Sequence, residues 1–600
     1  MTTNLTPLDW GFVFGFFALA LTIGAACARQ AGKSATDYFL SGRDMPWWLL
    51  GVSMVATTFS TDTPNLVTDM VRHNGVAGNW AWWAFLLTGM LTVFVYARLW
   101  RRSEVLTDVE FYEIRYSGRS AAFLRGFRAL YLGVFFNVVI MAAVSLAAIK
   151  IGGVMLGLSP VNSVLWAMIV TVLFSSMGGL KGVLLTDFFL FIIAMVGAIA
   201  AAVFALGLPE VGGLHGLMSN PAVAGKLSFF PHLQRGADGS FTPESVNLVV
   251  SLLVVPLAVQ WWSVWYPGAE PGGGGYLAQR MLAAKDERNA TNAVLFFNLA
   301  HYGLRPWPWI LVALCSLVVF PELKDIQAAF PQVDASIVRD DLAYPAMLHR
   351  TLPHGWLGLV LASLMAAYVS TISTHLNWGS SYVVNDFYRR FVRPEASERE
   401  LVRVGRVSTV LMMVLAGVVA LKLSNAMQAF NVLLQIGAGT GLLFILRWFW
   451  WRVNAASELT AMVVSFVVAI VLQFGSFDLR DWQKLLIGIG ITTAAWVAVA
   501  LLSKPTAPEV LKGFCEKIHP GGPGWRPVYE EMQRSGIRPK GDAVDLPRGI
   551  LSMLLGCLLT YAALFATGFS LYGKFAAAAA MATVATASLA ALLKLNRRKR

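Results

Sequence analysis

Residues 55–71, VATTFSTDTPNLVTDMV, begin as an apolar run and take on polar residues without leaving it. Asp62 and Asp69 place carboxylates in this run, and Pro64 interrupts it. A charged side chain in the middle of a membrane costs about 2.5–3.5 kcal/mol, so such residues usually face a water-filled cavity or a partner. Pro64 lacks an amide hydrogen, which leaves carbonyl oxygens near residues 59–61 without helical partners. A bare monovalent cation would satisfy these oxygens, so the stretch predicts a broken helix that lines an ion or solute pathway. A proline kink held by neighbouring helices is the alternative.

A second interrupted segment, VQWWSVWYPGAEPGGGGYLAQRML at 259–282, passes from apolar and aromatic residues into a break rich in proline and glycine. Two membrane segments interrupted in this way, in corresponding positions of two halves, indicate a transporter built from inverted repeats. About five apolar runs lie within 46–207, and about five more lie within 246–450. Because five is odd, the second group would cross the membrane in the opposite sense to the first.

A third segment, 359–390, begins as an apolar helix and then presents a group of hydroxyl side chains. Ser370, Thr371 and Thr374 fall at positions i, i+1 and i+4, so their hydroxyls can point to one place. Hydroxyl and carbonyl oxygens are the ligands that a hard cation prefers. The segment is therefore a candidate cation site, although Ser and Thr in membrane helices also hold neighbouring helices together.

The elements that would position these residues are membrane helices. Apolar residues make up 56% of the chain and charged residues 14%, against about 25% charged in a typical globular domain. About fifteen apolar runs are long enough to span a bilayer. We therefore expect an all-α polytopic membrane protein with a five-plus-five inverted-repeat core. The predicted units are an extra N-terminal helix (1–35), a first five-helix repeat (36–208), an external loop (209–245), a second five-helix repeat (246–450), additional helices (451–502), a cytoplasmic loop (503–547), and a C-terminal helical hairpin with a basic tail (548–600).

The net charge of +13 is concentrated in three segments, which argues against a nucleic-acid-binding surface. Their basic residues are Arg98, Arg101, Arg102, Arg115, Arg119, Arg125 and Arg128 in the first, Arg389, Arg390, Arg393, Arg399, Arg403 and Arg406 in the second, and Lys594, Arg597, Arg598, Lys599 and Arg600 in the third. With about fifteen spans, all three fall on one side, and cytoplasmic connections carry an excess of Lys and Arg. The pattern predicts an external N-terminus and a cytoplasmic C-terminus. The four scattered cysteines indicate neither a disulfide framework nor a zinc site.

Several stretches resemble the sodium/solute symporter family, which includes the sodium–glucose and sodium–proline carriers. They are DYFLSGRDMPWW (37–48), GGLKGVLLTDFF (178–189), YLAQRMLAAKDERNA (276–290), VSTISTHLN (369–377) and NDFYRRFVRP (385–394). The resemblance covers roughly residues 35–450 and implies a LeuT-like core. It also implies alternating-access uptake of a small organic solute, driven by sodium.

The resemblance implies a sodium site between the first broken helix and the eighth helix of the core. The ligands it implies are the backbone oxygens of Ala56, Phe59 and Ala367 and the hydroxyls of Ser370 and Thr371. Asp187 matches a carboxylate near the sodium sites of some members; a helix cap beside Lys181 is the alternative. Members with a second sodium site tend to have a hydroxyl where this chain has Ala367, which favours one sodium ion per cycle.

The resemblance places the substrate site at mid-membrane between the two interrupted helices. Its candidate residues are Asp62, Thr63, Trp82, Gln260, Trp262, Trp265, Tyr266 and His301. His301 stands where sugar carriers have a lysine, and Trp82 stands where they have a glutamate, which weakens a glucose-like assignment. The aromatic faces suit sugars, other solutes with an apolar face, and cationic groups. Arg305 is another intramembrane charge; pairing with a carboxylate is favoured over contact with an anionic solute.

We therefore expect a sodium-coupled symporter of the bacterial plasma membrane and not an enzyme. Its expected cofactor is the sodium ion, and its expected partners are the solute and the lipid bilayer, with no nucleic acid and no obligate protein partner. A sugar or related polar metabolite is favoured, and an amino acid or organic acid stays open. The alternative is a membrane solute sensor that signals through residues 503–547. A passive channel fits occluding broken helices less well.

Overall fold

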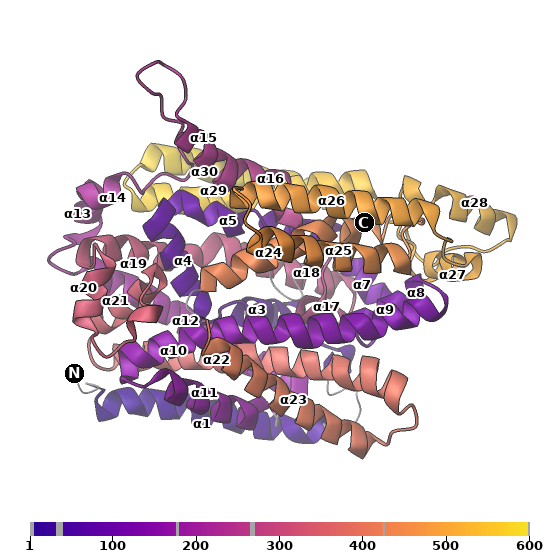
Figure 1. Cartoon of the computed structure of the whole chain (residues 1–600), viewed down its shortest axis with the longest axis horizontal. Coiled ribbons are helices and arrows are strands. Elements are labelled where there is room, and N and C mark those ends of the chain that lie inside the picture. The colour runs from indigo at the N-terminus through magenta and orange to yellow at the C-terminus, as the bar shows by residue number, and fades with distance from the viewer. Residues whose placement is uncertain (1–4, 32–39, 176–178, 264–269, 424–425, 598–600) are drawn as a thin grey trace.

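The computed structural model describes residues 5–31, 40–175, 179–263, 270–423 and 426–597 of the chain. Most helices run roughly along one common direction (Figure 1). Among the described residues, eleven helices are long and apolar enough to cross a membrane. Shorter apolar helices accompany them at Trp47–Thr57, Pro160–Val172, Pro243–Ala258 and Leu433–Leu446. These helices overlap the apolar runs expected from the sequence, and several extend beyond them, so the all-α membrane architecture is confirmed.

The first half of the core begins with a helix in two pieces. These pieces are α3 (Trp47–Thr57) and α4 (Asp62–Asn74). The helices that follow are α5 (Trp80–Trp83), α6 (Leu86–Leu91), π-helical η3 (Thr92–Tyr96), α7 (Ala97–Ser103), α8 (Phe111–Arg115), α9 (Gly118–Leu130), π-helical η5 (Tyr131–Phe136), α10 (Asn137–Leu156), α11 (Pro160–Ser175) and α12 (Gly179–Leu206).

The second half also begins with an interrupted helix. Its pieces are α15 (Pro243–Val249), π-helical η6 (Val250–Val254), α16 (Val255–Ala258), the short turn η7 (Gln260–Trp262) and α17 (Gly275–Ala283). The helices that follow are α18 (Glu287–Asn298), π-helical η8 (Leu299–Leu304), α19 (Pro306–Val319), α22 (Trp356–Ser381), π-helical η11 (Tyr382–Val392), α23 (Glu398–Ala420) and α24 (Ala426–Leu446).

The two interrupted helices run in opposite directions. Met45, just before α3, forms a β-bridge with Ala284, just after α17. Its amide donates to the Ala283 carbonyl oxygen at 3.2 Å. The start of the first interrupted helix therefore meets the end of the second. This is the relation that an inverted second half requires.

Short helices gather at the two ends of the molecule (Figure 1). One end carries α13 (Gly213–Ser219), α14 (Pro221–Ala224), α20 (Leu323–Ala329) and α21 (Ala343–Thr351). The opposite end carries α8, α27 (Pro508–Ile518) and α28 (Arg526–Arg534). The remaining long helices are α1 (Pro7–Ala31), α25 (Ala455–Phe474), α26 (Asp481–Leu502), α29 (Leu546–Leu571) and α30 (Phe575–Arg597).

The segment that carries α27 and α28 is docked onto the core. Arg115 of α8 is fully buried and donates to the carbonyl oxygens of Arg447 (2.9 Å) and Trp450 (3.0 Å). Its guanidinium lies 4.7 Å from the centre of the Trp525 ring, a cation–π contact. The Trp525 indole N–H in turn donates to the Trp448 carbonyl oxygen at 2.8 Å. Trp525 therefore anchors this segment to the core, through its ring on the buried Arg115 guanidinium and its hydrogen bond to Trp448.

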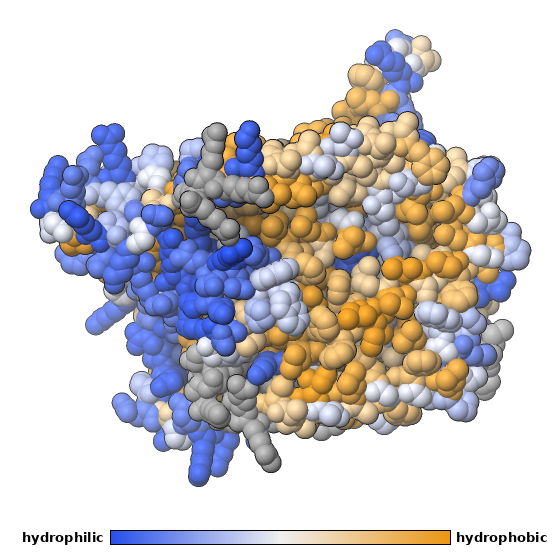
Figure 2. Space-filling view, turned by 180° about the vertical axis from the view of Figure 1, so that it is seen from behind, coloured by the Kyte–Doolittle hydropathy of each residue, from blue (hydrophilic) through white to orange (hydrophobic). Residues whose placement is uncertain are grey.

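The surface separates into an apolar body and a polar end. In Figure 2 hydrophobic residues cover most of the body, and hydrophilic residues gather at the end opposite α13. Exposed apolar side chains on the body include Trp166, Val203, Val418 and Val467. Such a broad exposed apolar surface is unusual for a soluble protein and suits contact with lipid.

Candidate functional site

The first core helix is broken at mid-length. α3 ends at Thr57 and α4 begins at Asp62, which leaves Thr58–Thr61 outside either helix. Pro64 lies in the first turn of α4, where a residue without an amide hydrogen costs a helix little. The break therefore precedes the proline, and every residue from Thr58 to Thr61 is buried.

The hydroxyl-bearing helix α22 contacts this break directly. The Thr371 hydroxyl donates to the Thr57 carbonyl oxygen at 3.0 Å, and Thr371 is fully buried. Ala56, Phe59, Ala367 and Ser370 are buried as well. The structure thus brings both halves of the predicted sodium site into one region of the core.

Asp187 joins three helices beside that region. It accepts hydrogen bonds from Ser53 of α3 (2.6 Å) and from Ser370 of α22. The residue lies inside α12, in its third turn, so the helix-cap interpretation is wrong. Arg280 of α17 donates to Ser53 Oγ at 3.4 Å, and it brings a positive charge near the carboxylate.

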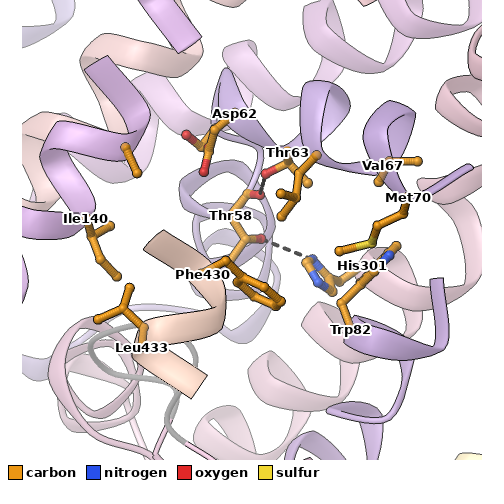
Figure 3. A pocket seen from close by; sticks show the side chains of 13 residues that line it. Thr58, Asp62, Thr63, Val67, Met70, Trp82, Ile140, His301, Phe430 and Leu433 are labelled. Carbon is orange, nitrogen blue, oxygen red and sulfur yellow. Dashed lines mark hydrogen bonds between the residues drawn. The ribbon is translucent and has the colours of Figure 1, made fainter. Parts of the chain in front are cut away.

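A cavity lies next to the break (Figure 3). Residues from the break and α4, from α5, α10 and η8, and from α24 line it: Thr58, Ser60, Asp62, Thr63, Leu66, Val67, Met70, Trp82, Ile140, Ala143, His301, Phe430 and Leu433. The polar groups come from the break, the start of α4 and His301, and apolar side chains form most of the rest. Such a cavity suits a small solute with polar groups on one side.

The predicted substrate residues divide into three sets. Asp62, Thr63, Trp82 and His301 line the cavity, and Trp265 and Tyr266 lie outside the described residues. Gln260 and Trp262 are not among the lining residues.

Gln260 and Trp262 instead hold the interrupted helix against its neighbours. Gln260 Nε2 donates to the Ala81 carbonyl oxygen at 2.9 Å. A Cβ added at Gly441 of α24 would lie 1.9 Å from the Trp262 carbonyl oxygen, so these two backbones are in direct contact. Only glycine permits this approach of the two backbones. Gln260 and Trp262 therefore fix the position of the second break.

Two polar atoms beside the cavity, Asp62 Oδ1 and His301 Nε2, are buried without a hydrogen-bond partner among the described residues, and the Ser60 side chain interacts with the Asp62 carboxylate. Buried polar groups in folded proteins are almost always hydrogen-bonded. Their arrangement beside a cavity indicates a polar ligand. The Trp82 indole N–H already donates to Asn79 Oδ1 at 2.8 Å, so its ring is the part available to a solute.

Arg305 supports the break. Its Nη1 donates to the Val55 carbonyl oxygen (3.0 Å) and to the Thr58 hydroxyl (3.2 Å), and its Nη2 lies 2.6 Å from His301 Nδ1. The guanidinium also stacks on Trp309, 4.9 Å from the ring centre. The expected ion pair with a carboxylate is not among the ion pairs of the described residues. The physical reason is that the end of α3 offers carbonyl oxygens that need donors.

The sequence reasoning missed the contact of Arg305 with the break and the cavity walls at Ile140, Phe430 and Leu433. The i, i+4 spacing of His301 and Arg305 was a usable signal for their contact. The apolar wall residues carry no such signal, because they resemble any other core residue.

Comparison with known proteins decides the family. The model of the Sodium:solute symporter family matches residues 38–465, more than half of the chain. The chain belongs to this family. The symporter is 24% identical over 505 residues to a sodium/glucose cotransporter of Vibrio parahaemolyticus, covering 82% of this chain and 89% of that protein. It is 26% identical to a sodium/mannose cotransporter of Bos taurus, covering 78% and 80%, and 24% identical to a sodium/sialic acid symporter of Proteus mirabilis, covering 83% and 96%.

A solved structure of a Na+-coupled sialic acid symporter in an outward-open state has the same fold. Its TM-score is 0.62 at 21% identity, covering 84% of this chain and 99% of that one. The five-plus-five LeuT-like core is thereby confirmed. The protein is a multi-pass membrane transporter and not an enzyme, and it couples solute transport to sodium. Sodium is a transported substrate here rather than a cofactor, which corrects the expectation from the sequence.

Proposed function

We propose that this symporter binds sodium between the first broken helix and α22 and carries a sugar or related polyol in the adjacent cavity. The hydrogen bond from Thr371 to the Thr57 carbonyl oxygen carries the proposal, because it joins a hydroxyl of α22 to the end of α3. A cation between these elements would be bound by oxygen atoms like those that form this hydrogen bond.

The proposed sodium ligands are the carbonyl oxygens of Ala56, Phe59 and Ala367 and the hydroxyls of Ser370 and Thr371. Asp187 supports the site, because its carboxylate accepts a hydrogen bond from Ser370 and places negative charge nearby. The attraction between a carboxylate and a nearby cation is much stronger in the protein interior than in water, because the interior has a lower dielectric constant.

The proposed solute site is the cavity that Asp62, Thr63, Trp82 and His301 line. Similar proteins are named for glucose, mannose, myo-inositol and sialic acid, of which three are uncharged and rich in hydroxyls. The Trp82 ring offers an aromatic face to the apolar side of such a molecule. The unpartnered polar atoms of Asp62 and His301 offer hydrogen bonds to its hydroxyls.

Coupling follows from the shared break. Sodium bound to its carbonyl oxygens would order Thr58–Thr61, of which Thr58 and Ser60 line the solute cavity. Each ligand then improves the site of the other, and this coupling is reciprocal. The sodium gradient supplies about 2.3 kcal/mol per charge for each 100 mV, in addition to the concentration term.

We infer a bacterial plasma-membrane location with the α8 and α28 end in the cytoplasm. The arginine-rich segments 98–128 and 389–406 meet at one place, where Arg125 pairs with Asp386 and Arg390 with Glu113. An excess of basic residues marks the cytoplasmic side. The N-terminus would then be external.

The test is uptake of labelled glucose, mannose and myo-inositol into proteoliposomes with an inward sodium gradient. We expect accumulation that collapses when choline or potassium replaces sodium. Accumulation that is equal in sodium and choline would overturn sodium coupling at the proposed site.

A further inference from the structure

We propose that Arg305 is a positioning residue that fixes His301 as a hydrogen-bond donor toward the cavity. His301 and Asp62 would then form a donor–acceptor pair for a hydroxyl of a neutral, polyhydroxylated solute. The inference rests on the proposed function, because it assigns the solute class of the same cavity.

The contacts of His301 determine which ring nitrogen carries its proton. A guanidinium has only donors, so the Arg305 Nη2 that lies 2.6 Å from His301 Nδ1 must donate to it. An Nδ1 that accepts a hydrogen bond carries no proton, and the proton of the neutral ring is therefore on Nε2. A doubly protonated ring would place two donors against each other.

Thr58 does not disturb this assignment. Its hydroxyl oxygen lies 3.2 Å from His301 Nδ1 and accepts from Arg305 Nη1 at 3.2 Å. Its own proton is directed to the Val55 carbonyl oxygen at 2.9 Å. The guanidinium thus organises the end of α3, Thr58 and the imidazole together.

His301 and Asp62 each have one polar side-chain atom without a hydrogen-bond partner in the described part of the chain. His301 Nε2 and Asp62 Oδ1 are both buried and unbonded, and both residues line the cavity. Figure 3 shows the Asp62 carboxylate directed into the cavity, with Thr58 between it and His301. A hydroxyl group both accepts from an N–H and donates to a carboxylate, so it matches both atoms. An ammonium group cannot accept from His301, and a carboxylate would be repelled by Asp62.

The charges of the region favour the same class of solute. Asp62 and Arg305 interact electrostatically and are opposite in sign. Both terminal nitrogens of Arg305 are engaged by the protein, and Arg305 is not among the residues that line the cavity. A neutral solute therefore adds no charge to this buried region, whereas burying an extra charge is costly.

The experiment compares two isosteric changes at His301 and one at Arg305 in proteoliposomes. The probes are labelled glucose, mannose, myo-inositol, sialic acid and proline. His301→Gln keeps a donor close to the Nε2 position, whereas His301→Asn places its amide near Nδ1 and removes the donor from the cavity. Arg305→Gln removes the guanidinium that orients the ring. Sodium-induced thermal stabilisation of each purified variant reports that the fold and the sodium site persist.

We expect sodium-dependent uptake of at least one neutral polyol in the native protein. His301→Asn and Arg305→Gln should raise the solute KM at least about fivefold, and His301→Gln should stay within about twofold. Half-saturating sodium should change less than twofold in both His301 variants. Arg305→Gln is judged by the solute KM alone, because Arg305 also donates to the Val55 carbonyl oxygen next to the proposed sodium ligand Ala56. Sodium-dependent uptake of sialic acid or proline alone would overturn the inference and leave sodium coupling intact. An unchanged KM in His301→Asn, or an equal defect in His301→Gln, would also overturn it. Polyol uptake that is equal with and without a sodium gradient would instead contradict the proposed function.

Discussion

Replacing Thr371 with valine tests the proposed sodium site with the smallest change of shape. Valine has nearly the shape of threonine but carries a methyl group in place of the hydroxyl, so the change at this fully buried position is mainly one of polarity. The substitution removes the 3.0 Å hydrogen bond to the Thr57 carbonyl oxygen. If Thr371 is also a sodium ligand, the ion loses one oxygen from its shell.

The expected effect can be estimated from the strength of the lost interaction. A hydrogen bond to a charged group contributes about 1.5–3 kcal/mol, and we take this as the scale for one neutral oxygen on a buried cation. At about 1.4 kcal/mol for each factor of ten, the half-saturating sodium concentration should rise roughly 10- to 150-fold. The maximal uptake rate at saturating sodium should fall much less.

The assay is initial solute uptake into proteoliposomes over a series of sodium concentrations at constant ionic strength. Thr371→Ser keeps the hydroxyl and should stay near the native curve. Thr567→Val serves as a matched control, because Thr567 is exposed on α29 and donates to Ala563 of its own helix. A native sodium curve for Thr371→Val would refute the reasoning. A Thr371→Ser variant as defective as Thr371→Val would show that the methyl packing, rather than the hydroxyl, matters.

Three further outcomes are expected. Asp187→Asn removes the negative charge next to Ser370 and should raise half-saturating sodium several-fold in the same uptake assay; an unchanged curve would reduce Asp187 to a structural role. Burial raises the pKa of the Cys515 thiol on α27 to about 12, so this thiol should react with maleimide far more slowly at pH 7 than a free thiol does; rapid labelling of the native protein would show that α27 undocks. Trp525→Ala removes the ring stacked on Arg115 and should destabilise the docked segment by about 3–5 kcal/mol. The change should be measured as faster Cys515 labelling and a lower Tm in detergent. Sodium-dependent uptake should persist if the segment is not a signalling output.

The sequence by itself determined the membrane architecture. Long apolar runs specify spanning helices, because a bilayer admits only helices or closed barrels. The position of the first break followed from Pro64, whose ring cannot continue a helix that precedes it. The sequence also showed Ser370 and Thr371 as neighbouring hydroxyl side chains in an apolar helix, and no tertiary information is needed to see this.

Other features depended on contacts between residues far apart in the chain. The three-helix junction at Asp187 joins residues 134 and 183 positions away from it, and hydropathy along the sequence carries no record of such pairs. Arg305 was expected to meet a carboxylate, but it donates to Val55, 250 positions earlier. A long charged side chain takes the strongest acceptors within its reach, and at a broken helix these are the freed carbonyl oxygens.

The walls of the cavity show the same limit. Ile140 and Phe430 face the cavity because α10 and α24 pack beside the break, and their apolar character would be equally suitable in any helix interface. Local patterns thus fix which residues are helical and which are polar inside the membrane. The packing of distant helices alone decides which of those polar atoms share a cavity, because that depends on where each helix axis lies and not on the order of residues along it.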